Sequence, residues 1–355
     1  MQASLLCSYL VPKVTNLRIT DSIALPSPVE LCDEISRNAE QKNLVRQTRE
    51  ALHALIHGQD KRLLAVVGPC SIHDLEACHE YAKRFAKLSE ELKERLLLVM
   101  RVYFEKPRTT VGWKGLIMDP QLNGTCDIPK GLRIARTFLG EVLDLGIPTA
   151  TEFLDPITPQ YLADSLCWAA IGARTSESQT HRQMASGLSM PVGFKNGTDG
   201  TITIATDAVQ AASHSHHFLS VTKQGVAAIF GTTGNPDCHV ILRGGQSGPN
   251  YERADVETVL DALRAKSLPP YLMVDCSHGN SLKDYTKQRL VVESVIEQRK
   301  ASDHGIFGVM IESHLVAGNQ PLRPNLSELT YGQSVTDACI GWDETELLFL
   351  KLAQR

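Results

Sequence analysis

The sequence predicts an α/β protein, a (β/α)8 TIM barrel with an N-terminal extension and an inserted β-hairpin. Three observations favour this fold. Short apolar runs alternate with stretches of helical periodicity along most of the 355 residues. Many of these runs are uniformly apolar, as strands buried on both faces of a parallel sheet must be. Eight such runs are present, and each is followed by a candidate helix.

Each strand is placed where an apolar run ends in a polar or glycine-rich turn, and each helix where capping residues open a periodic stretch. The expected strands are 63–67, 96–102, 149–153, 168–172, 192–195, 239–242, 272–275 and 307–311. The expected helices are 75–93, 129–145, 159–167, 179–187, 201–212, 254–265, 285–299 and 344–353. A doubly wound open sheet is the alternative, but Gly68-Pro-Cys-Ser71 after the first strand is not the glycine-rich phosphate fingerprint typical of that fold.

Two segments interrupt the alternation of strands and helices. Residues 1–58 precede the first strand, and we interpret them as an N-terminal extension, which leaves 59–355 as the barrel. Two short β-like runs, 217–221 and 227–231, meet around Gln224-Gly225. They predict an inserted hairpin at about 214–234.

Composition excludes several classes of protein. Hydrophobic residues make up 43% and charged residues 21%, which is typical of a globular chain. The net charge of -4 argues against a non-specific nucleic-acid binder, and no apolar run reaches the ~18 to 20 residues of a membrane span. The nine cysteines are scattered without a CxxC pair, and residues 1–7 lack the features of a signal peptide. We therefore expect a cytoplasmic protein with no nucleic-acid or membrane partner.

Cationic side chains follow several of the expected strands. They are Arg101, Arg174, Lys195 and Arg243. Because the carboxyl ends of barrel strands meet at one mouth, these charges would repel one another unless an anion binds there. Arginine suits a bidentate grip on carboxylate or phosphate. A second cationic segment, 105–109, follows the second strand, so there is room for two anionic ligands.

A metal site is the second expectation at the same mouth. Cys70, His278 and Glu312 follow strands, and Asp337 is a further candidate. One thiolate, one imidazole and two carboxylates suit one divalent Mn, Fe, Co or Zn ion better than Mg or Ca. Taken alone, a cysteine such as Cys70 is more often a buried core thiol than a metal ligand.

Six segments closely resemble the class I 3-deoxy-D-arabino-heptulosonate 7-phosphate (DAHP) synthases of the microbial feedback-regulated type. They are GPCSIH at 68–73, MRVYFEKPRT at 100–109, IGAR at 171–174, VGFKNG at 192–197, LRGG at 242–245 and DCSHG at 275–279. The resemblance covers roughly residues 15–353. It implies a metal-dependent barrel enzyme that condenses phosphoenolpyruvate with erythrose 4-phosphate and releases phosphate, the first step of the shikimate pathway.

The resemblance also assigns roles to individual residues. The positions that match metal ligands are Cys70, His278, Glu312 and Asp337. Those that match the phosphoenolpyruvate site are Arg101, Ala173, Arg174, Lys195 and Arg243, and those that match the erythrose 4-phosphate loop are Lys106, Pro107, Arg108 and Thr109. We expect Lys106 to assist the aldehyde oxygen, and Glu152 with Lys195 to position the attacking water.

Regulation is a further implication of the resemblance. The positions that match an aromatic amino-acid effector site are Pro159, Ser189, Phe218 and Ser220. Relatives with glycine at the position of Ser220 tend to respond to tyrosine, so we expect phenylalanine as the effector, with tryptophan second and tyrosine third. The related enzymes also imply a homo-oligomer, a dimer or a tetramer. By the same resemblance, the extension 1–58 has an oligomeric or regulatory role and 59–355 is the catalytic barrel.

Three other functions are compatible with the same barrel. A Schiff-base aldolase would use Lys195 as its nucleophile. The sibling synthase that accepts arabinose 5-phosphate carries Lys-Ala-Asn-Arg-Ser in its acceptor loop, whereas this chain has Lys106-Pro-Arg108. A non-catalytic, metabolite-sensing barrel would be expected to lose a ligand or an arginine, and none is lost here.

Overall fold

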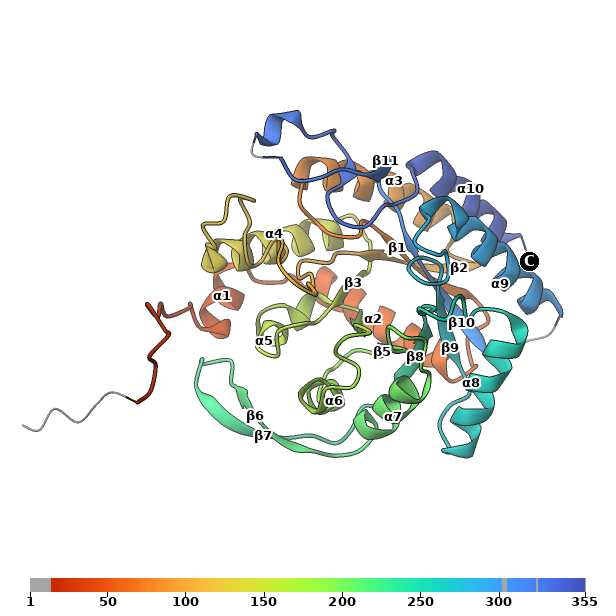
Figure 1. Cartoon of the computed structure of the whole chain (residues 1–355), viewed down its shortest axis with the longest axis horizontal. Helices are drawn as coiled ribbons and strands as arrows, with labels where there is room; N and C mark the ends of the chain where they lie inside the picture. The colour runs from red at the N-terminus through yellow and green to blue at the C-terminus, as the bar shows by residue number, and fades with distance from the viewer. Residues whose placement is uncertain (1–13, 302–304, 324, 355) are drawn as a thin grey trace, which may run out of the picture.

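A computed structural model describes residues 14–301, 305–323 and 325–354 (Figure 1). The described residues do not include the first thirteen residues of the expected extension, and with them the segment 1–7 that was assessed for a signal peptide. They also do not include the last residue of the expected barrel domain.

Eight parallel strands close into a barrel in the order β1-β10-β9-β8-β5-β4-β3-β2. The barrel closes because β1 pairs with both β2 and β10. The predicted fold is confirmed, and each predicted strand end lies within one residue of the observed end. The strands are β1 (Leu63–Gly68), β2 (Leu96–Arg101), β3 (Thr149–Glu152), β4 (Trp168–Ile171), β5 (Val192–Lys195), β8 (Cys238–Leu242), β9 (Leu272–Asp275) and β10 (Ile306–Glu312).

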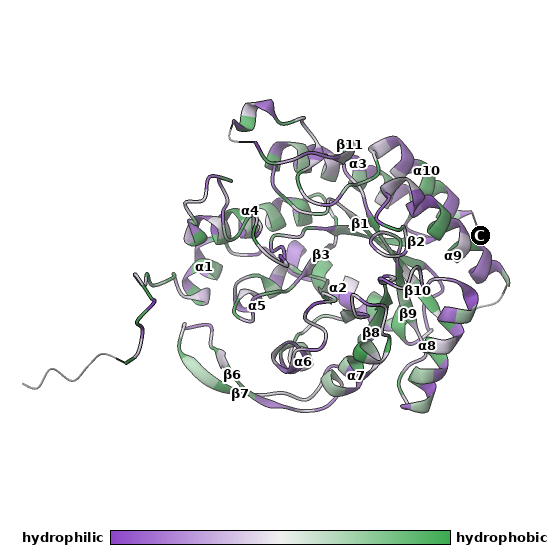
Figure 2. Cartoon of the chain, viewed as in Figure 1, coloured by the Kyte–Doolittle hydropathy of each residue, from purple (hydrophilic) through white to green (hydrophobic). Residues whose placement is uncertain are grey.

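The apolar runs form strands because both of their faces are covered. In β1 every residue is buried, and alternate side chains belong to two different clusters. Ala65 and Val67 pack with the surrounding helices, whereas Leu64 and Val66 fill the barrel interior. Figure 2 shows the result, with hydrophobic strands inside and hydrophilic colour on the outer helices.

Helices follow the strands around the barrel, and short polar side chains cap several of them. The Asp74 carboxylate accepts the backbone N–H of Ala77 and starts the first of these helices. The helices are α3 (Leu75–Leu92), α4 (Ile128–Asp144), α5 (Thr158–Leu162), α6 (Gln179–Ser186), α7 (Thr203–Ala212), α8 (Arg253–Ala265), α9 (Gln288–Ala301) and α10 (Trp342–Ala353).

The helix predicted at 159–167 is wrong in its length. α5 ends at Leu162, and a 3-10 turn, Ala163–Ser165, follows it. Arginine side chains from other helices donate hydrogen bonds to the backbone carbonyl groups that would accept from N–H groups in a longer helix. Arg136 donates to the carbonyl of Tyr161, and Arg49 donates to the carbonyl of Ala163 at 2.6 Å.

The predicted extension contains α1 (Pro28–Glu34) and α2 (Ala39–Ile56), which sequence analysis did not place. The buried side chains Leu52 and Ile56 of α2 pack in the same cluster as the barrel interior, so α2 covers the amino end of the strands. The described part of the extension is therefore joined to the barrel core. The division of the chain at residue 58 stays a prediction.

The predicted hairpin is present between α7 and β8. It consists of β6 (His217–Val221) and β7 (Ala227–Gly231), which pair antiparallel outside the barrel (Figure 1). Its turn meets the extension, because the backbone N–H of Val29 donates to the carbonyl of Lys223 at 2.7 Å. A small two-stranded sheet of β11 (Val316–Asn319) and β12 (Gln333–Ser334) was not predicted. None of the described helices has the length and apolar character needed to cross a membrane.

Candidate active site

A pocket opens at the carboxyl ends of the barrel strands. It brings together most of the residues that the sequence assigned to substrates. Its lining consists of Lys106, Pro107, Arg108, Glu152, Gly172, Ala173, Arg174, Lys195, Thr198, Arg243, His278 and Asp337. Thr109 is exposed and does not line the pocket, while Cys70, Arg101 and Glu312 are buried and also lie outside its lining.

Glu312, the last residue of β10, forms a buried ion pair with the predicted substrate residue Arg101. The Arg101 Nη2 lies 3.1 Å from Glu312 Oε1, and Ser277 Oγ donates to Glu312 Oε2 at 2.8 Å. Burial raises the pKa of Glu312, but nearby positive charge, from His278 first and Arg101 next, outweighs it and lowers that pKa to about 2. A permanent negative charge therefore lies below the mouth.

The four predicted metal ligands converge on that charge. Ligand atoms of Cys70, Glu312 and Asp337 all lie within 4.8 Å of one another. The fourth, His278, has its Nε2 3.9 Å from Glu312 Oε1. The set of thiol, imidazole and carboxylates fits a divalent Mn, Fe, Co or Zn ion.

The charge balance around Cys70 also fits a cation. Burial, followed by the charge of Glu312, raises the pKa of the Cys70 thiol to about 11. The ammonium of Lys106 lies 3.1 Å from Cys70 Sγ and partly offsets that effect. A divalent ion among these donors would favour the thiolate far more strongly than one ammonium does.

Asp275, at the end of β9, is a site residue that sequence analysis did not assign. Its Oδ2 contacts Lys195 Nζ at 3.0 Å and His278 Nδ1 at 2.9 Å. Burial raises the pKa of Asp275, but His278 and Lys195 outweigh it and hold that pKa well below its usual value. One carboxylate thus orients a predicted substrate residue and a predicted metal ligand.

Gly172, Thr198 and Ser277 were also missed. A side-chain Cβ at Gly172 would lie 2.5 Å from Oε1 of Glu152, so glycine leaves the space that this carboxylate occupies. The signal for Gly172 was its place at a strand end within the IGAR segment. Thr198 and Ser277 follow strands through turns whose shape the sequence does not specify.

A second hollow lies on the hairpin side of the barrel and has a volume of about 270 Å³. Two of the predicted effector residues, Pro159 and Ser189, line this hollow. The other two, Phe218 and Ser220, lie on β6 and are not part of that lining. The full lining is Arg49, Pro159, Gln160, Ala163, Asp164, Gly187, Leu188, Ser189 and Lys223.

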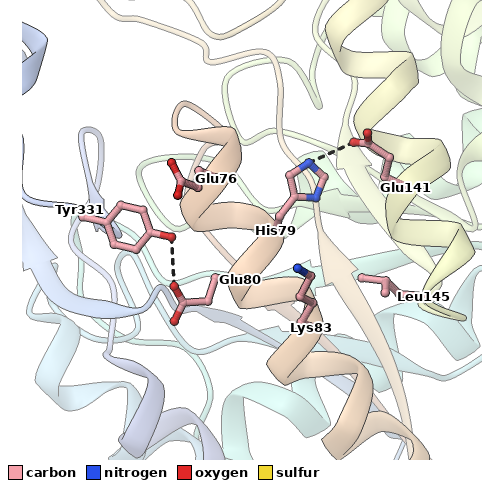
Figure 3. Close-up of a pocket in the computed structure, with 7 residues that line it drawn as sticks. All are labelled: Glu76, His79, Glu80, Lys83, Glu141, Leu145 and Tyr331. Carbon is pink, nitrogen blue, oxygen red and sulfur yellow. Dashed lines mark hydrogen bonds and ion pairs between the residues drawn. The ribbon is translucent and has the colours of Figure 1, made fainter.

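A larger hollow, of about 720 Å³, lies outside the barrel between α3 and α4 (Figure 3). Three glutamates and one lysine line it, together with His79, Leu145 and Tyr331. His79 points toward Glu141, and Tyr331 toward Glu80. This excess of carboxylates would repel an anionic ligand, whereas the mouth pocket is lined by cationic side chains.

Fold and site together define a (β/α)8-barrel enzyme that takes anionic substrates beside a metal-binding donor set. Comparison with known proteins narrows this class. The family model described as DAHP synthetase I family matches residues 36–350. The chain belongs to this family, as the resemblance of its motifs implies.

Individual relatives agree with the family match. The Phe-sensitive phospho-2-dehydro-3-deoxyheptonate aldolase of Escherichia coli K12 is 54% identical over 338 residues, which cover 95% of this chain and 96% of the relative. The Tyr-sensitive aldolase of the same organism is 52% identical and covers 96% of each chain. The solved structure of the aldolase from Francisella tularensis SCHU S4 has a TM-score of 0.92 at 50% identity and covers 95% of this chain and 98% of its own.

Proposed function

We propose that the mouth pocket condenses phosphoenolpyruvate with erythrose 4-phosphate to give DAHP and phosphate, the first step of the shikimate pathway. The observation that carries this function is a pocket lined by two groups of cationic side chains at the same end of the barrel as the metal donor set, two of whose members, His278 and Asp337, line the pocket. The test is phosphate release from the purified chain. We expect release only with both substrates and a divalent metal, and release with arabinose 5-phosphate as the better acceptor would overturn the assignment.

Phosphoenolpyruvate is proposed to bind on the side of Arg174, Lys195 and Arg243, with Arg101 below and the Ala173 backbone beside it. Arg243 is held in position, since its backbone N–H donates to Asn196 Oδ1 at 2.8 Å. Burial lowers the pKa of Arg243, with Asp275 opposing. A bound carboxylate and phosphate would neutralise this cluster, which explains why so many cations are kept in one pocket.

Erythrose 4-phosphate is proposed to bind on the segment of Lys106, Pro107, Arg108 and Thr109. Two hydrogen bonds shape this loop: the Lys106 N–H donates to the carbonyl of Lys114 at 2.9 Å, and Arg108 Nε donates to that of Trp113 at 2.8 Å. The loop therefore presents a lysine toward the metal donors and an arginine farther out. This order places the aldehyde near the metal and the phosphate near Arg108.

In the reaction, C3 of phosphoenolpyruvate forms a bond to the aldehyde carbon, and the aldehyde oxygen takes a proton. We assign that proton to Lys106. Burial lowers the pKa of Lys106, but the neighbouring thiol and carboxylates outweigh it and raise the pKa overall, so the group is an ammonium. When bound, the metal acts as a Lewis acid toward the aldehyde oxygen.

The second half of the reaction needs water at C2. Positive charge left on C2 is captured by a water molecule, which loses a proton, and cleavage of the C–O bond then releases phosphate and leaves a ketone. We assign the positioning of this water to Glu152 and Lys195. Glu152 lines the pocket with its carboxylate against Gly172, and this carboxylate can accept a hydrogen bond from water.

Lys195 is less suited to a Schiff base. Its Nζ is buried and forms an ion pair with Asp275 at 3.0 Å. A Schiff-base lysine must present a free amine to a carbonyl group. The ion pair favours anion binding over nucleophilic attack, and borohydride with either substrate is expected to leave Lys195 unmodified.

The two substrate sites predict separable kinetic effects. Arg108→Ala is expected to raise KM for erythrose 4-phosphate by about 10- to 100-fold with little change for phosphoenolpyruvate, because a charged hydrogen bond to one phosphate is lost. Arg174→Ala is expected to do the reverse. Steady-state kinetics with each substrate varied in turn will check this, and equal effects on both substrates would contradict the division of the pocket.

The hollow beside α5 is proposed to bind the aromatic effector. It offers a cation, Lys223, a carboxylate, Asp164, and the apolar Leu188, which suit the charged and apolar parts of an amino acid. The hydroxymethyl group of Ser220, on the adjacent hairpin, is proposed to limit the room for a phenol. This favours phenylalanine over tryptophan and tyrosine.

Feedback inhibition is tested with each aromatic amino acid. Phenylalanine is expected to inhibit, and Ser220→Gly is expected to weaken that inhibition at least about fivefold with uninhibited turnover kept, which corresponds to a coupling of about 1 kcal/mol. Activity is measured for both proteins against all three amino acids. Insensitivity of the natural chain to all three would remove the effector site and leave the synthase activity standing.

The protein is further proposed to be a cytoplasmic homo-oligomer, a dimer or a tetramer, and the hairpin supports its association. Leu219 and Ile229 pair across its two strands and are 86% and 72% exposed. Apolar side chains this exposed on a small sheet are typical of a surface that packs against another chain.

A further inference from the structure

A second cluster of metal-ligating side chains lies at the opposite end of the barrel from the active site. It joins His53 and His57 of the α2 region to Asp237, which precedes β8. The ligand atoms of all three lie within 4.8 Å of one another. We propose that these residues form a separate zinc site that ties the N-terminal extension to the barrel.

The spacing of the two histidines fits this role. In His53-Ala-Leu-Ile-His57 they are four residues apart, which places both rings on one face of a helix. Between them Leu55 and Ile56 are buried in the cluster that fills the barrel interior, so the helix cannot turn the rings away. The ring centroids lie 4.3 Å apart.

Both rings point at the same oxygen. His53 Nδ1 is 2.7 Å and His57 Nε2 is 3.0 Å from Asp237 Oδ1, and these histidines are the ion-pair partners of Asp237 among the described residues. A tetrahedral ion with bonds of about 2.0 to 2.1 Å needs ligand atoms roughly 3.3 Å apart. Small side-chain movements therefore admit a zinc ion in place of the shared hydrogen bonds.

Hydrogen bonds within its own loop hold the backbone of Asp237 in place. Its backbone N–H donates to Asn235 Oδ1 at 3.0 Å, and its carbonyl accepts a hydrogen bond from His239 Nδ1 at 3.0 Å. The Asn235 amide in turn donates to the carbonyl of Met190 at 2.9 Å. The carboxylate thus reaches the histidines from a rigid support, as a metal ligand does.

Charge and access also favour a cation here. His53 lies in the last turn of α2 and His57 is its C-cap, so the ligands lie at the negative end of the helix dipole. The side chain of His53 is 48% exposed, which leaves a coordination position open to water. Two imidazoles and one carboxylate suit zinc rather than magnesium or calcium.

The test separates this cluster from the catalytic donors. In a Cys70→Ser background, which disables the active-site set, apo protein is dialysed against Zn²⁺ and bound zinc is counted by mass spectrometry. We expect about one equivalent per chain, lost when His57→Ala is added. His79→Ala is the matched control, because His79 also pairs with a carboxylate, Glu141 at 3.0 Å, but belongs to no group of three ligands among the described residues (Figure 3).

Two further readouts guard against misfolding. Zn²⁺ is expected to raise the melting temperature of the Cys70→Ser chain, and this rise should vanish with Asp237→Asn while the melting temperature without metal stays within a few degrees. Co²⁺ is expected to give visible bands without sulfur charge transfer. Absence of bound zinc in the Cys70→Ser chain, or its retention with His57→Ala, overturns the proposed site.

Discussion

Cys70→Ser is expected to abolish turnover almost completely while the barrel still folds. The hydroxyl of serine is a weak neutral ligand, so the donor set of Glu312, Asp337 and His278 loses its thiolate. Loss of a Lewis acid removes several kcal/mol of transition-state stabilisation, about 10³-fold in rate. Metal content should fall by one equivalent per chain, measured together with kcat.

The control for this variant is Cys126→Ser, since Cys126 is exposed and does not belong to the group of candidate metal ligands that contains Cys70. It is expected to keep both metal and activity. If the Cys70→Ser protein keeps full metal content and normal turnover, Cys70 is not a metal ligand.

Asp275→Asn is expected to cause the second largest loss. The neutral amide would leave the buried ammonium of Lys195 without an anionic partner and would release the ring of His278. Breaking a buried ion pair costs about 3 to 5 kcal/mol of stability. We also expect kcat/KM for phosphoenolpyruvate to fall by about 10²- to 10³-fold, because both neighbours lose their orientation.

Asp207→Asn is the matched control, because Asp207 pairs with Lys266 at 2.8 Å where both side chains are partly exposed. An exposed pair contributes at most about 1 kcal/mol. The free energy of unfolding from denaturant experiments and the kcat/KM of this control should therefore stay close to those of the natural protein. If Asp275→Asn behaves like the control in both measurements, Asp275 does not orient the site.

The regularity of the barrel explains why its strands were predictable. A run such as 63–67 is apolar at every position because it is covered on both faces, and this property is visible in the sequence itself. The length of α5 was not predictable, because it depends on Arg49 and Arg136, which arrive from elements distant in the chain. The helices of the extension were missed because they precede the alternation of strands and helices that identified the elements of the barrel.

The same distinction holds for the active site. Arg174, Lys195 and Arg243 were predictable because parallel strands bring their carboxyl ends to one mouth, whatever the details of packing. Asp275 also ends a strand, yet its role depends on which two neighbours it touches, and only the closed barrel brings Lys195 and His278 to one carboxylate.

The sequence by itself determined the barrel, the cationic mouth and the choice of proposed metal ligands, since residue type and the alternation of strands and helices are visible along the chain. Only the tertiary structure decided which side chains contact one another. It placed Lys106 beside Cys70, left Phe218 and Ser220 outside the lining of the hollow proposed for the effector, and brought His53 and His57 to Asp237. The physical reason is that hydrogen bonds and ion pairs act over a few ångströms, and contacts between residues far apart in the chain exist only once the barrel has closed.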